Sequence, residues 1–117
     1  MSKNTTIFVS QLIVACPELI GLYRLHLVDQ GELLPHVFMG DVTRLVVSTA
    51  KQGSNSNWLT RMLGYFEAEL LSGNEEVAEL LGVSFVENLC GEDEAIQPLL
   101  PTMGEMLRKE VKSICGK

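Results

Sequence analysis

The sequence predicts an all-α protein, a single compact domain of five or six short helices over residues 1–117. Three observations lead to this fold class. Apolar residues recur mostly at spacings of three and four, which is the helical period. The chain shows neither a two-residue alternation nor an Asn-Gly hairpin signal. Glycines and prolines divide it into short segments, and 46% apolar content in 117 residues suits one globular core.

Three helices are predicted in the N-terminal half of the chain. The first covers about residues 5–16, with Thr5 or Thr6 as its cap. The second, about 17–29, opens with a proline and is followed by a closing glycine. The third covers about 34–51. The predicted inward positions are Leu19, Ile20, Tyr23 and Leu27 in the second helix and Val37, Phe38, Val42, Leu45 and Val46 in the third.

Three more helices follow the polar loop QGSNSN. The fourth covers about residues 58–71, with Ser56 or Asn57 as its cap. The fifth covers about 75–90, because SGNEE supplies a turn, a cap and two first-turn acids that suit the helix dipole. The last covers about 103–114 and carries basic residues near its C-terminal end. The predicted apolar stripe of the fourth helix is Trp58, Leu59, Met62, Leu63, Phe66 and Leu70.

The cysteines indicate a reduced protein. Cys16, Cys90 and Cys115 are odd in number, far apart and lack a C-x-x-C pair, so neither a disulfide framework nor a zinc site is predicted. We expect small apolar thiols and a cytoplasmic location. Residues 13–16 look like a bacterial lipoprotein cleavage site, but polar residues interrupt the apolar run 7–15 before it. No segment approaches the roughly 20 apolar residues that span a bilayer.

The charge distribution is the strongest functional signal. A net charge of −6 argues against binding to nucleic acid or to anionic membranes, and it is compatible with a basic protein partner. Residues 1–58 balance to zero, whereas 67–94 contain nine acids and no Lys or Arg. The run is either a solvated face, with Arg108 and Lys109 folded back on it, or a docking surface for a cationic partner. The candidate partner-binding residues are Glu75, Glu76, Glu79, Glu87, Glu92, Asp93 and Glu94.

No motif names a reaction, so we do not expect an enzyme, a cofactor or a metal. His26 and His36 could titrate near neutral pH, but neither belongs to an H-E-x-x-H or Glu-x-x-His ligand pair, and helix-face or helix-start positions explain them. The weakest alternative is a small enzyme that uses His36 with Asp41 or Glu32. Core packing, in preference to an adaptable binding groove, is predicted for Met39, Met62, Met103 and Met106.

Two phrases carry a family resemblance. LLPHVFMGDVTRLV, residues 33–46, and EEVAELLGVSFVENL, residues 75–89, resemble small helical immunity proteins encoded beside bacterial polymorphic toxins, including those of contact-dependent growth inhibition systems. The resemblance covers roughly residues 31–101 and consists mostly of apolar helix patterns. That family is not defined by catalytic residues, so the resemblance transfers none to this chain.

The resemblance and the charge lead to one functional hypothesis. An immunity protein binds its cognate toxin domain tightly, and many such toxins attack nucleic acid through basic clefts. The resemblance therefore implies a basic toxin domain as partner, with nucleases among the candidates. An acidic helical surface could occupy such a cleft and exclude the substrate. The alternative is a helical adaptor or regulatory module with another basic partner.

Overall fold

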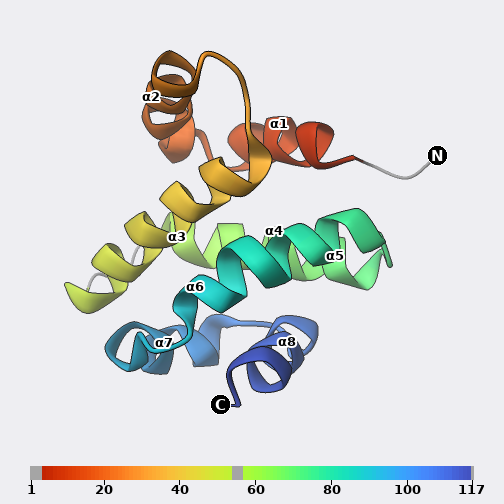
Figure 1. The fold of residues 1–117 in the computed structure, drawn as a ribbon. Helices are drawn as coiled ribbons and strands as arrows, with labels where there is room; N and C mark the ends of the chain where they lie inside the picture. Colours follow the sequence, from red (N-terminus) through yellow and green to blue (C-terminus); the bar gives the residue numbers. More distant parts are fainter. Residues whose placement is uncertain (1–3, 54–56, 117) are drawn as a thin grey trace.

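The computed structural model describes residues 4–53 and 57–116, which form one compact globule of helices without a strand (Figure 1). The predicted all-α class is confirmed. Seven helices occur in these two ranges when α5, η2 and α6 are counted as one continuous helix, called the long helix below (residues 75–89). The elements in chain order are α1 (Thr5–Ala15), η1 (Pro17–Leu19), α2 (Ile20–Gln30), α3 (Pro35–Lys51), α4 (Asn57–Leu71), α5 (Glu75–Leu81), η2 (Gly82–Val86), α6 (Glu87–Leu89), α7 (Asp93–Leu99), η3 (Leu100–Thr102) and α8 (Glu105–Cys115).

The prediction of five or six helices is wrong because it omits α7. This helix has only two turns, and its buried residues Ala95, Ile96 and Leu99 are too few to show a long helical period. Pro98 lies inside it and lacks the N–H of a regular helical bond. In so short a helix the loss is one bond, and packing of α7 against α3 stabilises the element.

The helix starts differ in detail from the predicted caps. The α1 cap is Asn4, whose Oδ1 accepts a first-turn backbone N–H at 2.8 Å, in place of Thr5 or Thr6. Asn57 is the first residue of α4, while Ser56, the other predicted cap, lies outside the described residues. The turn before α5 is confirmed as predicted, with an asparagine cap and two acids in the first turn.

The buried stripe of α3 is rotated from the predicted one. Phe38, Val42 and Val46 are fully buried as predicted, but Val37 is 43% exposed and Met39 is buried in its place. The rotation follows from the packing of α3 against two partners, α7 and the η2 segment of the long helix. Periodicity alone cannot report which side of a helix meets a second partner.

Aromatic rings from three elements meet in the core. Phe66 of α4 lies between Phe8 of α1, at 5.9 Å between ring centroids, and Phe85 of η2, at 5.1 Å. These three rings are fully buried, and their packing holds the long helix against α1 and α4. Core packing of the methionines is confirmed for Met39, Met62 and Met103, while Met106 is partly buried against the core.

The long helix contains a π-helical segment, η2, between α5 and α6. It carries the side chains of Ser84, Phe85 and Val86, all buried. A π segment widens the turn and shifts the carbonyl groups from their usual i+4 partners. The segment therefore changes the bonding of the backbone just before the helix ends at Cys90.

Candidate functional site

Six of the seven predicted acidic residues fall into two groups at opposite ends of the long helix, and the seventh, Glu87, lies on α6 between them. Glu75, Glu76 and Glu79 occupy the first two turns of α5 and are exposed. The second group, Glu92, Asp93 and Glu94, follows the end of α6 and forms the start of α7. The continuous helix 75–89 has a length of about 20 Å at 1.5 Å per residue, so the structure does not gather the seven acids into one cluster.

Local physics explains the first group. The Asn74 side chain accepts the backbone N–H groups of Glu76 at 3.0 Å and Val77 at 3.2 Å, which caps α5. Glu75 and Glu76 then lie where the positive end of the helix dipole favours negative charge. Further along the same helix, exposed Glu79, Val83 and Glu87 recur every four residues.

The negative charge of the second group is partly compensated by a nearby cation, which the sequence does not reveal. We define the acidic turn as residues 92–94. Lys51, in the last turn of α3, forms an ion pair with Glu92 at 2.9 Å. The hydrogen bond that Lys51 donates to Glu92, together with the nearby negative charges of Glu92 and Glu94, raises the pKa of Lys51. Compensation thus comes from Lys51, whereas Lys109 pairs with Glu105 of its own helix at 3.4 Å.

Two acids of the run have a structural role. The Glu67 carboxylate on α4 accepts the backbone N–H groups of Met106 at 2.8 Å and Leu107 at 2.9 Å, so it caps the start of α8. Glu69 is only 9% exposed and lies beside Tyr65. Burial, with the nearby Glu69 carboxylate, raises the pKa of Tyr65. Neither carboxylate is available to a partner in the way that an exposed acid is.

A groove of about 550 Å³ lies beside the acidic turn. One wall is a face of α3, and the other comes from the end of the long helix and the acidic turn. Sequence reasoning missed this groove, although the glycine at position 40 in the middle of a helix was a usable signal. Its lining residues are Gly40, Thr43, Arg44, Val47, Ser48, Lys51, Gln52, Asn88 and Glu92.

The two histidines occupy different environments. His26 is 2% exposed, and its Nε2 accepts the backbone N–H of Leu34 at 3.0 Å, which ties α2 to the start of α3. Because Nε2 is the acceptor, the neutral ring carries its proton on Nδ1, which lies 3.8 Å from an Asp41 carboxylate oxygen. His36 Nδ1 lies 2.6 Å from the hydroxyl of Ser84 in η2. Across the described ranges, no three His, Cys, Asp or Glu side chains are placed to hold a metal ion.

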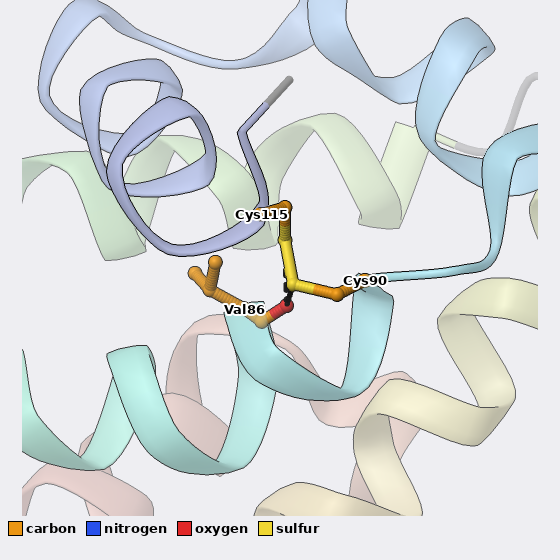
Figure 2. Close-up of a disulfide and its surroundings, with 3 residues drawn as sticks. All are labelled: Val86, Cys90 and Cys115. Carbon is orange, nitrogen blue, oxygen red and sulfur yellow. Dashed lines mark hydrogen bonds between the residues drawn. A yellow bond between two sulfur atoms is a disulfide. The ribbon is translucent and has the colours of Figure 1, made fainter.

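The expectation of three unpaired thiols is wrong, because Cys90 and Cys115 form a disulfide (Figure 2). Their Cα atoms are 5.2 Å apart, and the bond joins the end of the long helix to the end of α8. The two sulfurs lie 3.4 and 3.6 Å from the carbonyl oxygen of Val86. The helix crossing brings together positions 25 residues apart, which spacing could not reveal. Cys16 is the free, buried thiol, and burial raises its pKa.

Among the described residues, no single helix has the length and apolar character needed to cross a bilayer. Residues 5–15 and 17–30 reach that length and apolar character only as a pair, and the pair is bent by 109°.

Fold and surface together define a small all-α protein with acids at both ends of one helix and a groove beside the second group. The chain belongs to a family described as a domain of unknown function, DUF7674, which matches residues 9–116. No match was found among curated proteins or among solved structures.

Proposed function

We propose that this protein is an immunity protein, a non-enzymatic and cytoplasmic inhibitor that binds and neutralises one cognate bacterial toxin domain. The observation that carries the proposal is the acidic turn, where Asp93 and Glu94 are exposed and Glu92 faces one cation, Lys51. The resemblance of residues 33–46 and 75–89 to immunity proteins of toxin systems supports it as well. A basic toxin cleft is the complementary partner.

The acidic turn suits rapid capture of a basic partner. One-signed surface charge attracts a cationic protein before contact and orients the encounter, and salt screens the attraction. The first group of acids, at the start of α5, extends the negative field along the molecule. Because the two groups lie at opposite ends of a helix about 20 Å long, one partner contacting both must cover the whole length of that helix.

The proposed cytoplasmic location has a consequence for the redox state of Cys90 and Cys115. Cytoplasmic thiol pools keep most cysteines reduced, so Cys90 and Cys115 are expected there as a thiol pair. The Val86 carbonyl oxygen, 3.4 and 3.6 Å from the two sulfurs, would then accept their S–H groups. Finding the pair oxidised in protein taken from its native cell, with thiols trapped at lysis, would contradict the proposed location.

A helical adaptor is the second candidate function. It is favoured by apolar side chains left exposed on the N-terminal helices: Val14 is 82% exposed, Leu25 57% and Val28 80%. Leu25 and Val28 are three residues apart on α2 and so share one face of that helix. A cluster of exposed apolar residues is typical of protein-binding surfaces. An adaptor that used this surface would not depend on the acidic turn.

The test begins with capture of the tagged protein's partner from its native bacterium at low and high salt, identified by mass spectrometry. The captured toxin domain is then titrated with wild-type protein and with the pair Asp93→Asn and Glu94→Gln. The matched control, Asp29→Asn with Glu32→Gln, removes the same charge from the exposed last turn of α2 and the turn that follows it.

Immunity predicts that the partner is a toxin domain and that its activity is blocked. The acidic-turn variant should then associate about tenfold more slowly at low salt, with a smaller difference at high salt, while the control stays near wild type. Capture of a regulator or enzyme in place of a toxin would reject immunity and favour the adaptor. Equal association of both variants would reject the acidic turn as the contact surface.

A further inference from the structure

The floor of the groove consists of small or internally satisfied side chains. Gly40, Thr43 and Val47 recur at helical spacing along α3, so they share one face of that helix. The Thr43 hydroxyl lies 2.7 Å from the Met39 carbonyl oxygen and 3.0 Å from that of Ser84. Because its hydrogen-bonding need is met inside the protein, this floor can receive an apolar group without leaving a polar atom unpaired.

Polar and charged groups surround that floor. Asn88 Nδ2 donates to the Ser84 carbonyl oxygen at 2.8 Å, which holds the opposite wall in place. The Arg44 and Lys51 side chains are 73% and 43% exposed, so both stand at the rim. A flat aromatic ring suits such a site, because cations attract its face and amides can bond a tyrosine hydroxyl or an indole N–H.

A free anion is a poorer fit than an aromatic group. Both rim cations already have carboxylate partners, Arg44 with Asp41 and Lys51 with Glu92. An anion would have to displace one of those partners within an acidic protein of net charge −6. The uncharged body of the groove, by contrast, has about 550 Å³ available to an aromatic side chain.

The groove is continuous with the acidic turn. Lys51 and Glu92 line the groove and also line a second, smaller hollow with Asp93 and Glu94. A basic segment that reaches the acidic turn is therefore already at the edge of the groove. Interfaces commonly combine one buried aromatic anchor with a charged rim of this kind.

We propose that this groove is the anchor site for a partner's tryptophan or tyrosine side chain, flanked in the partner by Lys and Arg residues that contact the acidic turn. The proposal rests on the proposed function for the nature of the partner, a basic protein. It adds where specificity lies: the acids attract basic proteins in general, and the groove selects one with an aromatic residue at the correct position.

Gly40 provides the means to test the groove. A Cβ placed there would lie 3.8 Å from Arg44 Nη1 and 3.9 Å from Asn88 Nδ2, which are ordinary contacts. Gly40→Leu should therefore fill the floor without a backbone clash, and Gly40→Ala is a milder version that should also favour the helix. Gly64→Leu is the matched control, because Gly64 lies in α4 and a Cβ there meets nothing within 4 Å.

The probes are two synthetic peptides, Lys-Arg-Trp-Lys-Arg and Lys-Arg-Ala-Lys-Arg, titrated into isotope-labelled protein and followed by NMR. Wild type and Gly64→Leu should bind the tryptophan peptide several-fold more tightly than the alanine peptide. Binding should shift the NMR signals of Val47 and Asn88. Gly40→Leu should lose that preference, and Gly40→Ala should reduce it. The spectra of the free variants verify that each is folded.

Three outcomes would overturn the anchor site. The two peptides could bind wild type equally, the preference could survive in Gly40→Leu, or N-acetyl-tryptophanamide alone could bind as tightly as the tryptophan peptide. The last result would make the groove a small-molecule site. Failure of the proposed function has a different signature: the peptide preference would persist, while the partner captured from the bacterium would not be a toxin.

Discussion

The carboxylate of Glu67 occupies the position in which a side chain on Gly104 would stand. Gly104 is the N-cap of α8 and has extended backbone angles, φ −76° and ψ 176°, which any residue can adopt. A Cβ built on it would nevertheless overlap the Glu67 side chain. Glycine is therefore needed here because of a neighbour on α4, and that neighbour performs the capping that a serine or aspartate at 104 would normally perform.

The first prediction is that Gly104→Ser has opposite effects on stability in the wild type and in a Glu67→Ala variant. Gly104→Ser should destabilise the wild type by about 1–3 kcal/mol, because the new side chain collides with Glu67. In a Glu67→Ala background, Gly104→Ser should instead stabilise the protein by about 1 kcal/mol, since the serine hydroxyl can cap α8. Free energies of unfolding from urea titrations of the four proteins measure the coupling. Additive effects, within about 0.5 kcal/mol, would reject the shared site.

The control for that cycle is Glu105→Gln. Glu105 is exposed in the first turn of the same helix and pairs with Lys109 four residues on. Its loss should change the free energy of unfolding by no more than about 0.5 kcal/mol, which is typical of an exposed pair. A larger effect would mean that the start of α8 depends on general charge and not on the Glu67 carboxylate.

The second prediction concerns the disulfide between Cys90 and Cys115. Closing a chain segment of 25 residues restricts the unfolded state, and its stabilisation by the entropic model is about 3.5 kcal/mol. Reduction, or the replacement Cys115→Ser, should lower the free energy of unfolding by about that amount. Denaturant titration with and without reductant measures it. Reductant should not change the free energy of unfolding of Cys115→Ser. If reductant lowered the stability of this variant as much as that of the wild type, the disulfide would not be the cause of the loss.

The third prediction separates the cysteines by reactivity. Burial, with a smaller contribution from Glu18 and an opposing one from Arg61, raises the pKa of Cys16. A fully buried thiol kept protonated reacts slowly with iodoacetamide. Mass spectrometry of the folded, reduced protein should find label on Cys90 and Cys115 before Cys16, and all three labelled after unfolding. Early labelling of Cys16 would show that the core opens there.

The fourth prediction is an alkaline pH dependence. Burial and the Glu69 carboxylate raise the pKa of Tyr65 above its ordinary value of 10.0. Below that pH both states hold the proton; above it the unfolded chain releases it and the folded chain does not, so stability falls as pH rises. Above pH 10, the free energy of unfolding of Tyr65→Phe, measured by denaturant titration, should fall less steeply with pH than that of the wild type. Tyr23→Phe is the control, and parallel slopes for both variants would contradict the role of Tyr65.

Local features of the fold were readable from the sequence. Helical spacing predicted the all-α class, and Asn74 with two following acids predicted the start of α5. Such signals act within one or two turns, between residues three or four apart, so a linear pattern contains them. The exposed acids of the candidate surface belong to the same category, because first-turn acids in a polar turn remain on the outside.

Tertiary packing decided the rest. Glu67 and Glu69 look like the other acids of the run, yet one caps α8 across 39 residues and the other is buried beside Tyr65. The Cys90–Cys115 bond and the groove above Gly40 likewise depend on how α3, α8 and the long helix cross. The sequence by itself determined which segments are helical and where acids are concentrated. Which acids stay exposed was settled by contacts between distant residues, because side-chain packing between helices is not encoded in any local period.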